Sequence, residues 1–213
     1  MIRWILLVIL AASPAAAGPW LRAEGTTFSA TTAEISSSDP FGLALYTSVY
    51  AEYGLTPRLT LGFDGGSDTL GNGSGLIFLR FPLHVAEQSR MAAEIGLGAR
   101  WSLTERTPLV RPGLSWGRGI TLFGHSGWTT LDATLTIPGD GGAILPKLDA
   151  TLGLNRSDRL KLILGLTIER PGATLSPSLA YRVWDKTHLT LGLKLRSGGS
   201  GAHGLTFGFW QDL

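Results

Sequence analysis

The stretch KLDATLGLNRSDRLKLILGLTIE, from Lys147 to Glu169, decides the fold of this chain. Leucine, isoleucine and alanine occupy every second position, starting at Leu148 and resuming at Leu160. The positions between them are mostly charged residues, glycine and threonine. Alternation at period two indicates β-strands, because successive strand side chains point to opposite faces, and residues 155–158 have the composition of a turn. The stretch therefore predicts a β-hairpin.

The two faces of this hairpin differ in the surroundings they suit. The apolar face is almost entirely leucine and isoleucine, whereas the other face combines glycine and threonine with a few long charged side chains. The core of a soluble β-sandwich would mix side-chain sizes and include aromatic rings. A strand with lipid on one side and a crowded lumen on the other needs the pattern found here. We interpret the hairpin as part of a membrane-spanning barrel, with a soluble sandwich as the alternative.

The composition agrees with a membrane protein that has no helical span. The chain has 213 residues, of which 29 are glycine and 16% are charged, against about 25% charged residues in a soluble domain. Its mean hydropathy is +0.18. Beyond the amino terminus, no apolar run approaches the roughly 18 residues of a membrane helix. The absence of cysteine excludes disulfides and thiol chemistry. With a net charge of +2 and no dense basic cluster, nucleic-acid binding is not expected.

The amino terminus has the features of an export signal. Arg3 supplies a positive charge, residues 4–12 are apolar, and the segment ends in small residues at Ala17. This pattern predicts a signal peptide over residues 1–17, cleaved after Ala17, and one domain over residues 18–213. An uncleaved anchor helix is the alternative, although the apolar run is too short to span a bilayer.

The same alternation recurs along the rest of the chain. It predicts an all-β fold, a transmembrane antiparallel up-and-down β-barrel of twelve strands, within a range of ten to fourteen. Residues 65–75 are predicted to form a polar loop, and residues 117–127 a longer connection. Pro82, Pro112 and Pro177 fall inside predicted strands. Because proline has no N–H to donate to a β-ladder, we expect a bulge or a local loss of pairing at each.

At this level the chain resembles the outer-membrane β-barrel proteins of Gram-negative bacteria. The resemblance rests on the export signal, the lack of cysteine, the repeated alternation and a final amphipathic strand with Phe207 and Phe209. It is a resemblance of architecture. It implies an outer-membrane location, contact with outer-membrane lipid and the barrel-assembly machinery, and both chain ends in the periplasm. Such proteins commonly end in an aromatic residue, whereas this chain ends in Leu213. No cofactor or metal is expected, and the oligomeric state is not indicated.

The inward parity of the strands predicts the lining of the lumen. Eight cationic and six acidic side chains lie on this parity. Because positive and negative charges nearly balance in a confined space, ion pairs between neighbouring strands are favoured. Three aromatic residues beside the periplasmic connections, Tyr53, Trp116 and Trp184, are predicted to form an interfacial girdle, with an ordinary core role as the alternative. The predicted lumenal residues are Glu52, Asp64, Arg80, His84, Glu94, Arg100, Arg111, Asp132, Lys147, Asp149, Lys161, Glu169, Arg182, Lys194 and Arg196.

Such a lumen indicates a narrow passive pore or a structural barrel, rich in glycine and charge, with weak anion preference. A lipid-modifying outer-membrane hydrolase and a surface adhesin or receptor are the alternatives. A hydrolase would need a base and a nucleophile. If the hairpin at residues 87–90 is symmetric, His84 faces Glu94, but no serine can be placed beside them. Adjacent His125 and Ser126 would point to opposite faces of a strand. An adhesin needs long loops, whereas the predicted outer loops are mostly about 4–8 residues.

One glycine-rich segment invites a metal-binding interpretation. Residues 65–73, GGSDTLGNG, resemble the glycine-aspartate repeats that bind calcium in β-rolls. Those sites need stacked copies to complete a coordination shell, and this chain has one copy. A surface loop is therefore the prediction for this segment.

Overall fold

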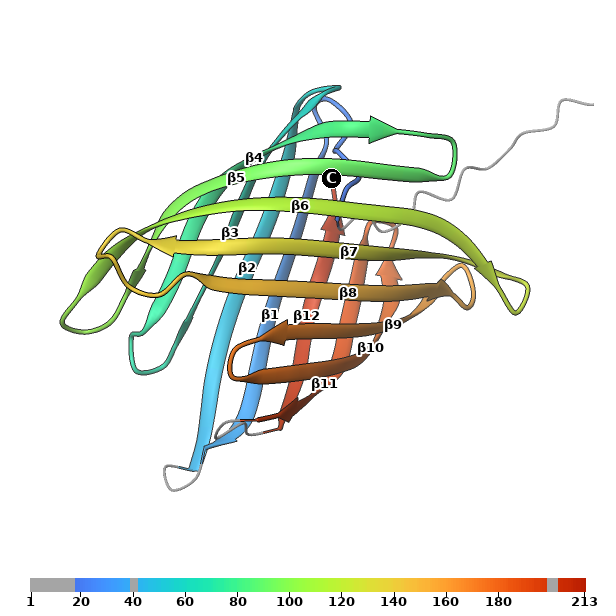
Figure 1. The fold of residues 1–213 in the computed structure, drawn as a ribbon. Helices are drawn as coiled ribbons and strands as arrows, with labels where there is room; N and C mark the ends of the chain where they lie inside the picture. The colour runs from blue at the N-terminus through green and yellow to red at the C-terminus, as the bar shows by residue number, and fades with distance from the viewer. Residues whose placement is uncertain (1–17, 39–41, 199–202) are drawn as a thin grey trace, which may run out of the picture.

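The structure, a computed structural model, describes residues 18–38, 42–198 and 203–213. The predicted signal peptide, residues 1–17, lies outside the described residues. Twelve antiparallel strands close into one barrel in which each strand pairs with its sequence neighbours and β1 pairs with β12 (Figure 1). The predicted fold class and strand number are confirmed. The strands are β1 (Thr27–Ser38), β2 (Gly42–Thr56), β3 (Leu59–Asp68), β4 (Gly73–Val85), β5 (Ser89–Trp101), β6 (Arg106–Leu122), β7 (His125–Pro138), β8 (Leu145–Asn155), β9 (Leu160–Glu169), β10 (Gly172–Trp184), β11 (Thr187–Ser197) and β12 (Gly204–Asp212).

The start of β1 and the end of β12 lie at one rim of the barrel, which we call the terminal rim. There Thr27 and Leu213 exchange two backbone hydrogen bonds, of 2.9 and 2.8 Å. Residues 57–58, 86–88, 123–124, 156–159 and 185–186 connect strands at this rim. The opposite rim, called the far rim, carries the connections at residues 69–72, 102–105, 139–144 and 170–171.

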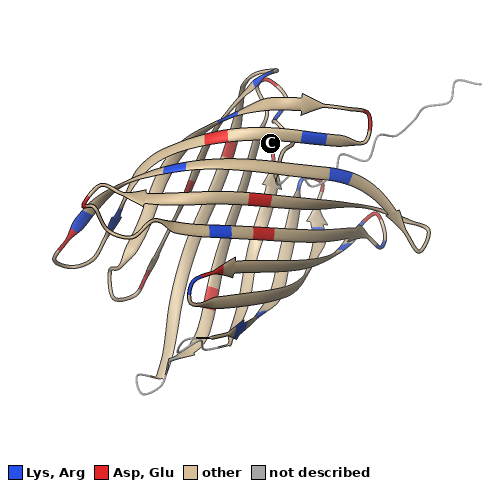
Figure 2. Ribbon diagram, in the orientation of Figure 1, with Lys and Arg blue, Asp and Glu red and all other residues tan. Residues whose placement is uncertain are grey.

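The outer wall of the barrel is apolar. Leu162, Leu164 and Leu166 of β9 are 42%, 43% and 38% exposed, while Ile163 and Gly165 between them are more covered. The same alternation holds in β11, where Leu189, Leu191, Leu193 and Leu195 all face outward. Figure 2 shows the charged residues as separate bands on otherwise uncharged strands. No helix among the described residues is long and apolar enough to cross a membrane.

Two glycine-rich runs that predict loops are strands in the structure. β3 continues to Asp68 and β4 begins at Gly73, so the connection shrinks to residues 69–72. A Cβ at Gly66 would lie 2.5 Å from the hydroxyl oxygen of Tyr46, so glycine here makes room for a ring inside the wall. Likewise, β6 continues through residues 117–122 to a turn at Phe123, where positive φ values at residues 123 and 124 suit a two-residue hairpin. The predicted long loops are wrong because these glycines serve packing rather than turning.

The prolines disturb the β-ladders as expected. At Pro82 the β4–β5 register shifts through a bulge. The β6–β7 ladder stops pairing at Arg111 and Pro112, while the pairing of Pro112 with Ile95 on the other side persists. The β10–β11 ladder is interrupted at Pro177 in the same one-sided way, since Pro177 still pairs with Leu164. Pro112 and Pro177 therefore each disturb one flanking ladder and leave the other in register, whereas Pro82 lies beyond the end of the β3–β4 ladder.

Candidate lumenal site

The best-buried charged group among the described residues is the Glu52 carboxylate of β2. Its side chain is fully buried, and it accepts a 2.6 Å hydrogen bond from Nε of Arg22 and a 2.5 Å bond from a guanidinium nitrogen of Arg80. The hydroxyl of Tyr50 donates to the same carboxylate at 2.5 Å. A buried carboxylate is stable only when it is paired and hydrogen-bonded, and Glu52 has both kinds of partner.

From Glu52 the ion pairs continue across the wall to β6. Arg80 also contacts Glu94 at 2.8 Å, because the β4–β5 register places these two residues directly opposite each other. Arg111 of β6 then contacts Glu94 at 3.5 Å and Asp64 at 2.7 Å. Charges of alternating sign thus offset one another from strand to strand. We call this set, Arg22, Glu52, Arg80, Glu94, Arg111 and Asp64, the Glu52 network.

Small residues in the wall give the network its space. The ring of Phe78, which is 1% exposed, covers Gly62, where a Cβ would lie 2.0 Å from a ring atom. The guanidinium of Arg80 stacks over that ring at 5.1 Å, and the ring of Tyr50 lies 5.9 Å from it. Any larger side chain at residue 62 would displace the ring on which Arg80 rests, so the glycine positions the charge.

A second cluster of ion pairs joins β1 to β11. Glu34 of β1 contacts Lys194 of β11 at 2.7 Å and also pairs with Arg196. The glutamate reaches across β12 over Gly204, where a Cβ would lie 2.9 Å from its carboxylate oxygen. Sequence reasoning missed Glu34, although it is the acidic residue of β1 on the parity opposite to Ala33.

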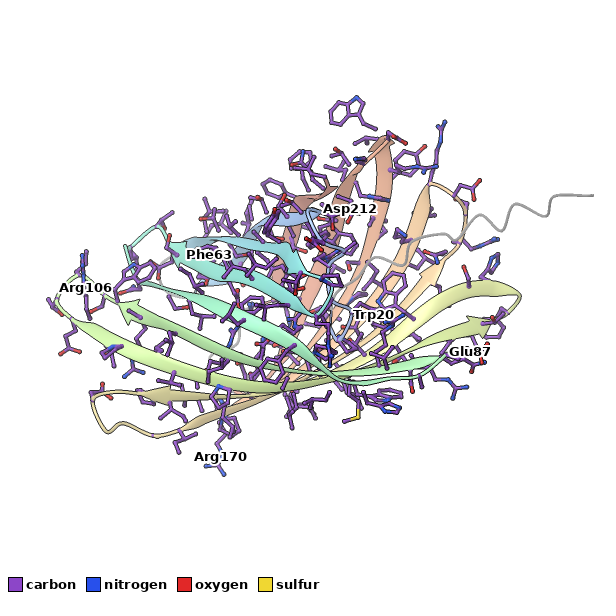
Figure 3. The ribbon with its side chains drawn as sticks, turned by 90° about the horizontal axis from the view of Figure 1, so that it is seen from above. Trp20, Phe63, Glu87, Arg106, Arg170 and Asp212 are labelled. Carbon is purple, nitrogen blue, oxygen red and sulfur yellow. The ribbon has the colours of Figure 1, made fainter. Side chains whose placement is uncertain are left out.

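The segment before β1 lies inside the barrel, which sequence reasoning did not foresee. We call residues 18–26 the N-terminal segment. Trp20 is labelled between strands in Figure 3, and its nearest ring atom lies 2.6 Å from where a Cβ of Gly117 would be. Pro19 is fully buried. Arg22 joins the Glu52 network, and its backbone N–H donates to the Thr60 hydroxyl at 3.0 Å. The segment therefore runs from β7 across the lumen to β2 and β3.

Two further ion pairs lie toward the far rim. Arg100 contacts Asp140 at 3.0 Å, and Lys147 contacts Asp149 at 2.9 Å. The Gly142 backbone N–H, with Arg100 adding its charge, holds the pKa of Asp140 below its usual value. All four side chains are 30–45% exposed, so these pairs stabilise the fold less than the Glu52 network does.

Besides His84, four predicted lumenal residues have no ion-pair partner among the described residues: Asp132, Lys161, Arg182 and Glu169. Lys161 donates to the Asn155 side chain at 3.1 Å and lies 5.7 Å from the ring of Trp128. The register places Lys161 of β9 opposite Ala180 of β10, two residues from Arg182. His188, opposite Arg182 on β11, is 9% exposed. The fourth of these residues, Glu169, is exposed beside the far rim.

Neither histidine pairing considered from the sequence forms. The β4–β5 register pairs Glu94 with Arg80, and after the bulge at Pro82 His84 lies opposite Met91, exposed near the terminal rim. The symmetric-hairpin assumption is therefore wrong. His125 contacts Arg156 at 3.1 Å. Ser126 instead accepts a hydrogen bond from the Asn155 side chain at 3.1 Å. No cluster of three or more possible metal ligands occurs in the described part of the chain.

The three predicted interfacial aromatics occupy different heights. Tyr53, 43% exposed, and Trp184, 69% exposed, lie near the terminal rim. Trp116 is half-buried, and β6 continues beyond it to Leu122. Trp116 therefore does not lie beside a connection, because the strand does not end where the glycines begin.

A cavity lies at each rim of the barrel. A cavity of about 540 Å³ at the far rim is lined by Tyr46, Arg100 and Trp101. Another of about 740 Å³ at the terminal rim is lined by Trp20, Arg118 and Trp128. The Glu52 network and the N-terminal segment lie between these vestibules. A further cavity of about 950 Å³ is lined by residues of β5–β10, many of them apolar and outward-facing.

No protein-family model and no curated protein matches this chain. Among solved structures, it is similar to the KdgM porin at 8% identity, with a TM-score of 0.66 over 86% of this chain and 98% of the porin. A structure described as KdgM porin in complex with disordered oligogalacturonate has the same values. An outer membrane channel from Pseudomonas putida F1 is 15% identical, with a TM-score of 0.51 over 89% of this chain and 96% of the channel. At these identities the likeness establishes the fold, which is that of outer-membrane β-barrels.

Proposed function

We propose that this protein is a narrow outer-membrane channel that passes small solutes with a weak preference for anions. In this proposal residues 1–17 are removed during export and the terminal rim faces the periplasm. The apolar outer wall meets the membrane, and the two vestibules open to the two aqueous sides. The supporting fold is shared with a porin and with an outer membrane channel.

The observation that carries the proposal is the pair of lumenal cations without carboxylate partners. Most charges in the lumen offset each other within ion pairs and leave little field for a passing ion. Lys161 and Arg182 lie on neighbouring strands of the wall opposite the Glu52 network, and neither has a carboxylate within ion-pair distance in the described chain. A solute with negative charge would complete their pairing. One KdgM porin structure is described as a complex with disordered oligogalacturonate, so such solutes form the first panel to test.

The narrow bore follows from what fills the lumen. Twelve strands enclose a space between that of eight-stranded barrels, which side chains fill, and that of sixteen-stranded porins, which stay open. Here Trp20 and Pro19 occupy part of that space, and the Glu52 network occupies more. We therefore expect a small conductance.

The first test is location. The exported protein should fractionate with outer membranes and should migrate faster on a detergent gel before boiling than after it, because closed barrels resist detergent. Recovery as a soluble periplasmic protein would overturn the membrane assignment.

The second test is ion selectivity in planar bilayers. For the purified wild-type protein we expect small channels whose reversal potential in a salt gradient indicates weak anion preference. The double variant Lys161→Gln, Arg182→Gln should lower the anion-to-cation permeability ratio, because it removes the uncompensated cations.

The matched control exchanges the two charges, as Lys161→Arg with Arg182→Lys, and should keep the preference. Lys186→Gln, at an exposed turn of the terminal rim, should change it little. Large, strongly cation-selective wild-type channels, or equal selectivity in the double variant and the wild type, would refute the proposed role of this pair.

A further inference from the structure

The N-terminal segment ends at a carboxylate that lacks a cation. Gly18 is buried, and a Cβ built on it would lie 2.8 Å from a methyl carbon of Thr130 and 3.5 Å from a carboxylate oxygen of Asp132. The nitrogen of Gly18 is bonded to the same Cα. Rotation about the backbone bonds of Gly18 alone would therefore bring this nitrogen within ion-pair distance of the Asp132 carboxylate.

The surroundings of Asp132 leave its charge uncompensated. Its neighbour on β6 is Ser115, and its neighbour on β8 is another carboxylate, Asp149. Like charges directly opposite each other in a sheet are destabilising. Lys147 is the cation beside Asp149 and contacts it, not Asp132. Hydroxyl groups of Ser115 and Thr130 bond to Asp132 but carry no charge. Arg80 acts on Asp132 through its charge but is paired with Glu52 and Glu94. The site itself holds two carboxylates and one cation, and one further positive charge would balance it.

We propose that export processing supplies this charge. A membrane-bound export peptidase hydrolyses the Ala17–Gly18 peptide bond, consuming one water and leaving a carboxylate on Ala17 and a free amine on Gly18. The amine takes up a proton, since an α-amine is mostly protonated at neutral pH, and pairs with Asp132. Before cleavage the same nitrogen is a neutral amide and cannot do so. Asp132 is thus the acceptor of the mature amino terminus.

This ion pair fixes the N-terminal segment at a second point. Arg22 already attaches the segment to Glu52 on β2, and the Gly18 amine attaches it to Asp132 on β7. Between these points Trp20 fits against Gly117, where no side chain interferes. The segment therefore crosses the lumen as a plug that is fixed at both points only in the processed protein.

The first experiment identifies the terminus and measures its accessibility. The intact mass of protein purified from outer membranes should correspond to residues 18–213. At neutral pH, labelling of the Gly18 amine by an amine-reactive reagent, followed by peptide mass spectrometry, should be about tenfold slower in the wild type than in Asp132→Asn, which corresponds to about 1.4 kcal/mol of pairing. Asp149→Asn, whose carboxylate already has Lys147, should label at the wild-type rate.

The second experiment tests the free amine without any substitution in the barrel, by means of a cleavable extension before Gly18. The chain refolded with an uncleaved extension before Gly18 should show a larger and noisier conductance than the same protein after protease has exposed Gly18. The amine-labelling result requires no channel activity, so it can fail independently of the proposed function. A mass that begins at another residue, equal labelling of Asp132→Asn and wild type, or equal conductance before and after removal of the extension would each overturn the proposal.

Discussion

Replacing Glu52 with glutamine is expected to lower the free energy of unfolding by about 3–5 kcal/mol. The substitution keeps the shape of the side chain but leaves two buried guanidinium groups without their shared carboxylate. Arg22 and Arg80 are 8% and 4% exposed, so water cannot replace the lost charge. Arg80 retains Glu94, whereas the strongest carboxylate contact of Arg22, 2.6 Å long, is lost.

The measurement is reversible urea unfolding of the barrel in lipid vesicles, followed by tryptophan fluorescence. The matched control is Asp149→Asn, which removes the carboxylate of a partly exposed ion pair and should cost about 1 kcal/mol or less. If the two substitutions cost the same, the Glu52 network would not be the electrostatic centre of the lumen.

Leu164→Arg should destabilise the inserted barrel by about 2–4 kcal/mol if Leu164 lies near the bilayer midplane, since a charge there faces hydrocarbon. Leu164 is in the middle of β9 and 43% exposed on the outer wall. Thr167→Arg, on the opposite face of the same strand, should be tolerated better. Thr167 donates a 2.5 Å hydrogen bond to Asp149, and an arginine there would meet that carboxylate.

The same unfolding assay in vesicles compares the two variants. Equal costs would mean that the faces of β9 are assigned the wrong way round. A soluble core would also penalise arginine at residue 164, so fractionation must accompany this measurement.

The face of the barrel wall on which each side chain lies could be predicted from the sequence, because it depends on the pleat of the strand alone. Alternation in the stretch from Lys147 to Glu169 assigns each side chain to one face before any partner is known. The structure places Glu52, Arg80 and Glu94 together inside the wall. Their pairing could not be derived, since it depends on register, and register depends on bulges such as the one at Pro82.

Features of the fold that have no periodic pattern could not be predicted from the sequence. The glycines at residues 65–66 and 117–119 have the composition of loops, yet they line strands against which Tyr46 and Trp20 pack. The N-terminal segment has neither alternation nor a motif, and its place in the lumen results from contacts with residues far along the chain, such as Asp132. Composition carries no information about such contacts.

The pairing of β1 with β12 also determines the order in which the barrel can fold. All other strand pairs join neighbours in sequence, so their short turns close with little loss of chain entropy. The β1–β12 pair instead joins residues from opposite ends of the chain, Phe28 with Asp212 and Ile35 with Leu205. Contacts of such sequence separation form slowly. A nascent sheet of eleven hairpin-linked ladders therefore has two open edges until the last strand is made, and it must be shielded from pairing with other chains until its own ends meet.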